Sequence, residues 1–259
     1  MSAQPGAAPV TSAPAARPTN RRRTVRRYLP PQHGAWAMLL LPFLVGAAVV
    51  GPRWLQLPLF GAWLAGYLLS YYVFQAIKSR RPRRFRAQLW VYALIAMPLA
   101  LAVVVVRPAA LWYAPAYAVL LAVNAWYAWR RRERALLNDL ASVVQSCLLI
   151  FVVATVAGVS PEQVVPAFVA VLLYLVGTVC YVKTMIRERG SAAYLRLSIS
   201  YHLVALVAAT LLDVLLAPIF LVLLIRAWLL PGRRLRPAQV GAIEIVSSVL
   251  VFITLVLIS

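Results

Sequence analysis

The chain has 259 residues, of which 63% are hydrophobic and only 12% are charged, and its mean hydropathy is +0.83. A soluble domain of this length could not bury so much apolar surface, so the composition excludes a soluble protein and predicts an integral membrane protein. The formal charge of +20 then reports membrane topology, and nucleic-acid binding is not indicated, because arginine clusters beside apolar segments mark cytoplasmic loops.

The first 27 residues are rich in Ala, Pro, Ser and Thr, then in Arg, with almost no large apolar side chain. This composition predicts that residues 1–27 form a disordered basic tail on the cytoplasmic side. The length of the tail and its late arginines do not fit a cleaved signal peptide, so we expect the first apolar segment to remain in the mature protein. Residues 28–259 are predicted to form one membrane domain.

A helix needs about 20 apolar residues to cross the hydrocarbon core of a membrane. Only Asp213 separates the seventh candidate span from the eighth, and prolines 42, 98, 115 and 218 fall inside spans, where neighbouring helices can satisfy the freed carbonyls. We therefore predict an all-α fold, a polytopic bundle of about nine transmembrane helices. The candidate spans are residues 33–51, 57–77, 88–106, 109–129, 138–157, 163–183, 195–212, 213–230 and 240–258.

The basic residues test this topology. If nine helices alternate in direction, the tail, the loops after the second, fourth, sixth and eighth helices and the adjoining helix ends face the same side, and all but two of the 26 Lys and Arg residues fall there. Only Arg53 and Arg107 fall on the opposite side. Because cytoplasmic loops are enriched in Lys and Arg, we predict a bacterial inner-membrane protein with its N-terminus in the cytoplasm and its C-terminus outside.

Polar side chains gather in the cytoplasmic half of the predicted helices, at spacings that place them on one face of each helix. This one-sided clustering predicts a cavity open to the cytoplasm above an apolar floor. The alternative is that these side chains form helix–helix hydrogen bonds and interfacial belts. The residues are Tyr67, Ser70, Tyr71, Gln75, Lys78, Asn124, Tyr127, Asn138, Ser142, Gln145, Ser146, Tyr174, Thr178, Tyr181, Lys183, Arg187, Tyr194, Ser198, His202, Glu244, Ser247 and Ser248.

The segment PPQHGAW, residues 30–36, places Gln32 and His33 at the entrance of the first span. Its two prolines stop any helix that arrives from the tail, so Gln32 or His33 can cap the free amides of the first helix. His33 also enters from the cytoplasmic side, level with the polar faces, and the alternative is that it faces a ligand.

Two carboxylates each have two interpretations. Asp139 follows Asn138 at the start of the fifth span, where the helix dipole favours a negative charge. Glu244 lies one turn into the ninth span, where Arg236 or the helix terminus would pair with it. The alternative for each is a role in a ligand site or in catalysis.

Lys183 and Arg187 are four residues apart and so share a helix face, which points at the cavity or at lipid phosphates. The arginine run over residues 80–86 is interpreted as a topology signal and a contact with anionic lipids. Cys147 and Cys180 lie inside apolar segments and predict neither a disulfide nor a zinc site. Motifs such as GxxxxGK[ST], HExxH and GxSxG do not occur, and the sequence shows no pairing of a nucleophile with a base.

Two stretches resemble a known family. PPQHGAWAMLLLPFLVG (30–46) and RPAQVGAIEIVSSVLVF (236–252) resemble the YwiC-like family of bacterial integral membrane proteins. Together they bracket nearly the whole membrane region.

A more distant resemblance is to the UbiA prenyltransferase superfamily, whose members are nine-helix bundles with a cytoplasm-facing cavity. YAWRRRERALLNDLASVVQ (127–145) is similar to their basic junction between the fourth and fifth helices. YYVFQAIKSRR (71–81) and VKTMIRERG (182–190) fall where those proteins carry two aspartate-rich loops that hold Mg²⁺. Neither stretch contains Asp, and Glu188 is their only acid, so Mg²⁺-dependent prenyl transfer is not expected and no cofactor is identified.

The sequence therefore predicts a UbiA-like bundle with a cationic, cytoplasm-facing pocket for an amphiphile, such as an isoprenoid, a quinone or a lipid. One alternative is a divergent membrane transferase that uses Asp139 or Glu244 in place of the missing aspartates. A further alternative is a small transporter or a membrane subunit of a complex, although no internal repeat is visible. Head-group binding is assigned to Lys78, Lys183 and Arg187, and the pocket lining to Gln32, His33, Asn138, Asp139, His202 and Glu244.

Overall fold

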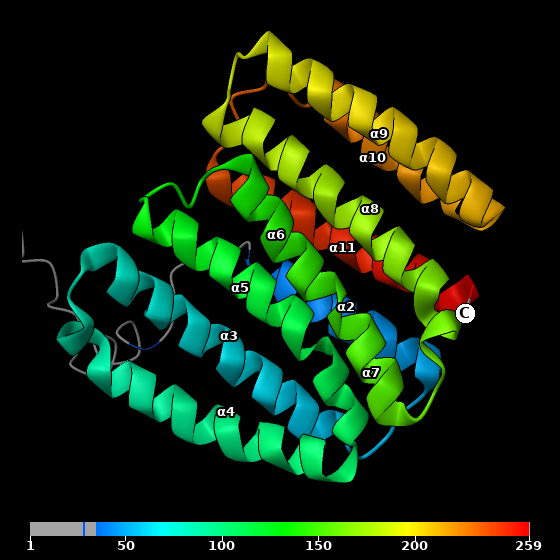
Figure 1. The fold of residues 1–259 in the computed structure, drawn as a ribbon. Helices are drawn as coiled ribbons and strands as arrows, with labels where there is room; N and C mark the ends of the chain where they lie inside the picture. Colours follow the sequence, from blue (N-terminus) through cyan, green and yellow to red (C-terminus); the bar gives the residue numbers. More distant parts are fainter. Residues whose placement is uncertain (1–27, 29–34, 259) are drawn as a thin grey trace, which may run out of the picture. The chain divides into compact units, whose positions relative to one another are not determined.

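The computed structural model describes Tyr28 and residues 35–258, and the regular segments among these residues are all helices (Figure 1). The predicted tail over residues 1–27, and with it Gln32 and His33, lies outside the described residues. The helices are α2 (Ala35–Val50), α3 (Gln56–Ser79), η1 (Pro82–Phe85), α4 (Arg86–Val106), η2 (Pro108–Tyr113), α5 (Ala114–Trp129), α6 (Leu136–Cys147), α7 (Leu149–Ala157), η3 (Pro161–Val164), α8 (Val165–Val182), η4 (Lys183–Arg187), α9 (Ala192–Leu212), η5 (Val214–Leu216), α10 (Ala217–Leu229) and α11 (Pro237–Ile258).

Seven of the helical segments are long and apolar enough to cross a membrane. Two shorter apolar helices, Trp36–Val50 and Val214–Leu229, match the first and eighth predicted spans. The prediction of an all-α polytopic bundle is therefore confirmed, and the chain is a multi-pass membrane protein. The division at Asp213 is also confirmed, because its backbone is extended and its carboxylate accepts a hydrogen bond from the Leu215 amide at 2.8 Å.

Proline and glycine set the ends of several helices. The short helices η1, η2 and η3 each begin with a proline, at a position where the missing amide hydrogen leaves no bond unmade. The helix α7 ends at Gly158, whose φ of +77° is left-handed and costs glycine little. A Cβ atom at this position would lie 3.2 Å from Nη2 of Arg107, so a larger residue would strain the turn and press on that arginine.

Pro42 lies inside α2, where its ring leaves the carbonyl of Met38 without the usual amide partner. Ser146 of α6 replaces that partner, because its hydroxyl donates a hydrogen bond to the Met38 carbonyl oxygen. At this proline, the prediction that a neighbouring helix satisfies the freed carbonyl is confirmed.

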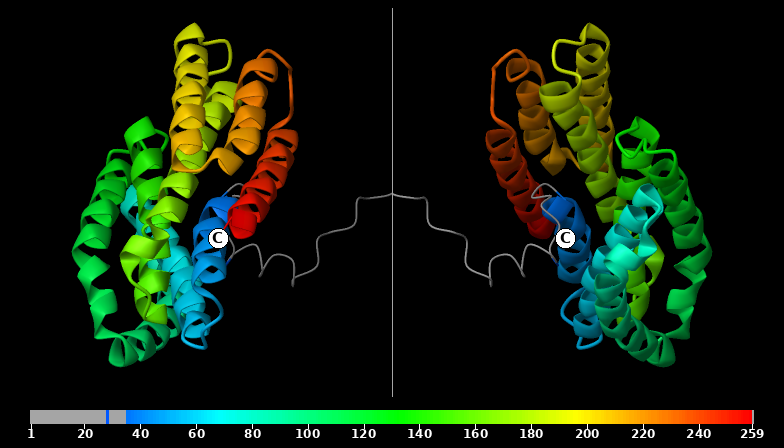
Figure 2. Two further views of the ribbon diagram at one scale, coloured as in Figure 1. Left: turned by 90° about the vertical axis from the view of Figure 1, so that its right-hand side faces the viewer. Right: turned by 90° about the vertical axis from the view of Figure 1, so that its left-hand side faces the viewer.

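Within residues 32–259, α2 lies at the centre and contacts α3, α6, α7, α8 and α11. The largest apolar core forms around it, with Val45, Val143, Ile150 and Val171 fully buried. The hairpin of α3 and α4 and the hairpin of α9 and α10 lie at opposite edges (Figure 1), and Figure 2 shows the same separation from two further directions. The centre of the unit is therefore built from helices that are far apart in sequence.

Side-chain contacts bring the arginine-rich loops together at one end of this unit. Lys78 at the end of α3 forms an ion pair of 2.8 Å with Glu133, in the loop between α5 and α6. The ammonium group of Lys183, at the end of α8, donates to the carbonyl oxygen of Arg134 in the same loop at 2.6 Å. Three loops that the topology assigned to one side therefore touch.

The fourth arginine-rich loop joins them through Arg189, whose guanidinium donates to the Leu235 carbonyl at 2.9 Å. Arg53 and Arg107 lie at the other end of the unit, in the loop between α2 and α3 and directly before η2. The charge alternation predicted from the sequence is therefore present in the fold. We name the arginine-rich end the basic end; it comprises the loops 80–86, 130–135, 183–191 and 230–236.

Candidate functional site

Most of the predicted site residues in the described part of the chain lie in or beside two polar clusters, one at η4, which continues α8, and one against α8 itself. The Asp139 cluster consists of Asp139, Lys183 and Arg187, and the Glu244 cluster is built around Glu244 and Arg226. Both clusters lie toward the basic end. Thr178, which touches the second cluster, precedes Lys183 by five positions, a rise of about 8 Å along a helix.

Asp139 lies in the first turn of α6 and faces the end of α8. Its Oδ2 atom is 2.8 Å from Nζ of Lys183 and 3.6 Å from Nη1 of Arg187. The Lys183 side chain is only 4% exposed, whereas that of Arg187 is 42% exposed. Lys183 therefore holds α6 and the preceding loop against α8, while Arg187 makes a longer contact and faces outward. The dipole at the start of α6 adds to the stability of the Asp139 carboxylate.

A π-helical turn, η4, presents these two cations. The amide of Glu188 donates to the carbonyl of Lys183 at 2.8 Å, five residues back, and such a turn is wider than an α-helical one. Within this turn, Lys183 and Arg187 contact the same oxygen of Asp139. Turns of this kind are rare and often occur at functional sites.

Lys78 and Asn138 lie beside the Asp139 cluster, through the loop that contains Glu133. The side chains of the Lys78–Glu133 pair are 43% and 32% exposed. The Nδ2 atom of Asn138 donates to the Glu133 carbonyl at 2.9 Å. Its Oδ1 atom is buried and has no hydrogen-bond partner among the described residues. This corner therefore combines two exposed cations, Lys78 and Arg187, with a buried acceptor.

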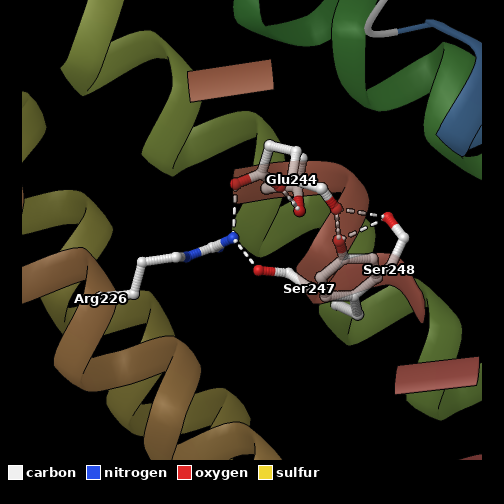
Figure 3. A network of polar contacts seen from close by, with 6 residues as sticks. Arg226, Glu244, Ser247 and Ser248 are labelled. Atoms are coloured by element: carbon white, nitrogen blue, oxygen red, sulfur yellow. Dashed lines mark hydrogen bonds and ion pairs between the residues drawn. The ribbon is translucent and has the colours of Figure 1, made fainter. Parts of the chain in front are cut away.

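Glu244 pairs with Arg226 of α10 (Figure 3), and the predicted pairing with Arg236 or the helix terminus is wrong. Arg236 precedes Glu244 by eight residues, which separates them by about 12 Å along a helix axis. The helices α10 and α11 are joined by a short loop, so a residue near the end of α10 lies level with one near the start of α11. Both side chains of the pair are less than 10% exposed.

Further polar groups surround this ion pair. Arg226 donates through Nη1 to Ser247 at 3.0 Å as well as to Glu244, and Thr178 donates to the other carboxylate oxygen at 2.8 Å. The guanidinium carbon lies 4.2 Å from the ring centre of Tyr181, a cation–π contact. The Nε and Nη2 atoms of Arg226 and the Tyr181 hydroxyl are buried without a hydrogen-bond partner among the described residues.

His202 lies on α9, against the same turn of α8. A Cβ atom added to Gly177 would lie 3.1 Å from the Nε2 atom of His202, so the two helices are closely packed there. The Nδ1 atom is 2.7 Å from the carbonyl oxygen of Ser198 and must therefore carry the proton. Nε2 is then an acceptor in the neutral ring, and it has no partner among the residues that the structure describes.

Several of the remaining polar residues connect helices. Asn124 of α5 donates to Gln145 of α6 at 3.2 Å and accepts from Ser142 at 3.4 Å. Tyr174 of α8 is 2.8 Å from the hydroxyl of Ser248 in α11. For these residues, the interpretation as helix–helix hydrogen bonds is confirmed.

The transferase hypothesis requires carboxylates close enough to share a metal. Asp139 is bonded to Lys183 and Arg187, whereas Glu244 is bonded to Arg226, so each carboxylate is held by different cations. Within Tyr28 and residues 35–258, no three His, Cys, Asp or Glu side chains come together in a way that could hold a metal ion. The donor set of the described residues therefore does not fit a divalent cation.

A family model described as YwiC-like protein matches residues 29–154. The uncharacterized protein YwiC of Bacillus subtilis is 32% identical over 226 residues, which cover 86% of this chain and 95% of that protein. An uncharacterized protein of Haemophilus influenzae is 30% identical over 231 residues, with the same coverage of both chains. No solved structure matches the chain, and the resemblance to the UbiA superfamily stays a prediction.

Proposed function

We propose that this chain, which belongs to the YwiC-like protein family, binds a membrane amphiphile with an anionic or polar head group at its basic end. The head group would contact Arg187 and Lys78, and the apolar part of the amphiphile would lie among the helices or in the surrounding lipid. Isoprenoids, quinones and lipids have this chemistry.

The observation that carries the proposal is an excess of cations where three helices meet. Lys78, Lys183 and Arg187 face only two carboxylates, Glu133 and Asp139, in a loop region that also carries four arginines. The pairs that involve Lys78 and Arg187 are partly exposed, so water and ions reach them. An anionic head group would compensate the remaining positive charge.

The three cations would have different roles. Lys183 already bonds to Asp139 and to the Arg134 carbonyl in a buried position, so it would position the loop and the carboxylate. Arg187 lies 3.6 Å from Asp139, a weak contact that a phosphate or carboxylate could replace with two parallel hydrogen bonds. Lys78 would act as a second point charge.

The excess of Lys and Arg at the basic end supports a cytoplasmic position for that end. The head group would then lie at the inner surface of the membrane, where anionic lipids attract basic segments. Arg53 and Arg107 would face the outside.

The Glu244 cluster favours a second candidate function, the movement of a proton or a small polar solute. An ion pair inside a transmembrane bundle is costly and often marks such a pathway. Here the pair lies beside three groups with unused hydrogen-bonding capacity, on Arg226, Tyr181 and His202.

Native mass spectrometry of the detergent-purified protein, incubated with a lipid extract of its own membrane, tests the first proposal. We expect an amphiphile to be retained by the wild type and by Arg196→Ala, which removes an exposed cation on α9 outside both clusters. The double variant Lys78→Ala plus Arg187→Ala should lose it. Equal retention by all three proteins, or no amphiphile beyond bulk phospholipid, would overturn the proposal. Retention that requires added Mg²⁺ would move the transferase hypothesis ahead.

A further inference from the structure

A groove lies on the outer face of the α3–α4 hairpin, next to the basic end. It consists of two hollows of about 410 Å³ and 340 Å³ that are neighbours, because Pro82 and Leu89 line both. Its apolar surface includes Leu69 and Val73 of α3, and Trp90 and Ala93 of α4. This volume is in the range of small-molecule sites. We name it the hairpin groove.

Three arginines line the hairpin groove with the apolar parts of their side chains: Arg83 and Arg86 in the larger hollow and Arg80 in the smaller one. We name these three arginines the rim. All three are exposed, and none forms an ion pair with any residue that the structure describes. The sequence from residue 80 to residue 90 contains no Asp or Glu that could compensate them. The rim therefore differs from Lys78 and Lys183 nearby, whose charges are matched by carboxylates of the protein.

The backbone at Arg80 is unusual for an arginine. It ends α3 with φ of +53°, a left-handed conformation that most helices reserve for glycine at this position. The chain must turn here, because Arg81 is followed by Pro82, which cannot continue the helix. Glycine would make the same turn with less strain, and Arg131, in another loop of the basic end, has a similar φ of +56°.

We propose that the hairpin groove binds an anionic glycerophospholipid, with its phosphate against the three arginines and one acyl chain along Leu69, Leu89 and Ala93. Anionic head groups attract basic segments at the membrane surface, and Trp90, which is exposed beside the groove, suits the boundary between head groups and hydrocarbon. The site shares no residue with the Asp139 cluster, so the inference does not rest on the function proposed above.

The test is a titration of the full-length protein in detergent with dioleoylphosphatidylglycerol or dioleoylphosphatidylcholine, with the bound fraction measured by native mass spectrometry. Arg83→Ala plus Arg86→Ala should weaken phosphatidylglycerol binding about 25-fold, about fivefold for each arginine. Phosphatidylcholine binding should fall much less, because the choline ammonium of that lipid already compensates its phosphate. Arg233→Ala plus Arg234→Ala removes the same charge from another loop of the basic end and should keep the wild-type affinity.

Two further variants distinguish a loss of lipid binding at the groove from a loss of the fold. Arg80→Gly relieves the backbone, so its thermal midpoint should equal or exceed that of the wild type while phosphatidylglycerol binding falls about fivefold. Ala93→Trp fills the groove without a change of charge and should also weaken binding. Equal losses in the Arg233/Arg234 control would show a diffuse charge effect, and equal affinity for the two lipids would show that the arginines do not select the head group. Either result, or full binding by Arg80→Gly, would overturn the proposal.

Discussion

The pair Arg226–Glu244 and the pair Lys78–Glu133 lie toward the same end of the bundle, yet they have opposite surroundings. The side chains of the first pair are 6% and 8% exposed, and those of the second are 43% and 32% exposed. A buried charge that loses its partner cannot recover the loss from water, whereas an exposed one can. Burial therefore makes the loss of one partner costly in the first pair and leaves the second pair free to exchange its partner for a ligand. The Lys183–Asp139 pair, at 4% and 25%, lies between them.

The largest effect should follow from breaking the Arg226–Glu244 pair. Arg226→Met leaves a carboxylate in an apolar surrounding and should lower the free energy of unfolding by about 3–5 kcal/mol, measured by titration with SDS. Adding Glu244→Gln removes that charge but keeps an acceptor for Thr178, so the double variant should recover most of the loss. Equal destabilisation by the single and the double variant would contradict the structural role of the pair.

Lys183→Met tests the intermediate case. It removes a charged hydrogen-bond donor from Asp139 and from the Arg134 carbonyl, and the free energy of unfolding should fall by about 1.5–3 kcal/mol. The loss should be smaller than for Arg226→Met, because Asp139 is partly exposed and keeps its contact with Arg187. In an Asp139→Asn background, the same substitution should lower the free energy of unfolding by a smaller amount. A loss that is unchanged by Asp139→Asn would show that Lys183 stabilises the fold through packing alone.

A buried hydrogen bond between neutral groups shows whether a group must be charged for its loss to destabilise the fold. Ser146→Ala removes the donor that satisfies the Met38 carbonyl, and should lower the free energy of unfolding by about 1–2 kcal/mol. In a Pro42→Ala background, the restored amide at position 42 can bond to that carbonyl, so Ser146→Ala should then have almost no effect. If the two substitutions were additive in the SDS titration, the serine would not be acting on the carbonyl freed by the proline.

The spans and the charge alternation could be predicted from the sequence because both depend on local composition. Apolar length determines which segments cross a membrane, and the break at Asp213 was visible as the one acidic residue in a long apolar stretch. The same count of spans determines on which side of the membrane each arginine run lies.

The partners inside the bundle could not be predicted in this way. Helical spacing shows which residues share a face of one helix, but it does not show which helix that face meets. For this reason the sequence predicts one pocket where the structure has two clusters beside α8. Proximity in the sequence pairs Glu244 with Arg236, whereas its partner Arg226 lies 18 residues away and its charge is already explained by the membrane topology. A signal was present, since Arg226 is the single charged residue of α10 and Glu244 that of α11.

The smallest effect on stability should come from Lys78→Ala, and here the comparison between buried and exposed pairs is sharpest. Because both side chains of the pair are partly exposed, the free energy of unfolding should change by less than about 1 kcal/mol, and by less still at high salt. The same variant should nevertheless reduce retention of the amphiphile. Glu133→Gln supplies the matched control, because it keeps the cation and removes its competitor, so retention should rise above that of the wild type. Were Lys78→Ala to destabilise the fold as much as Lys183→Met, exposure would not distinguish the binding cations from the structural ones.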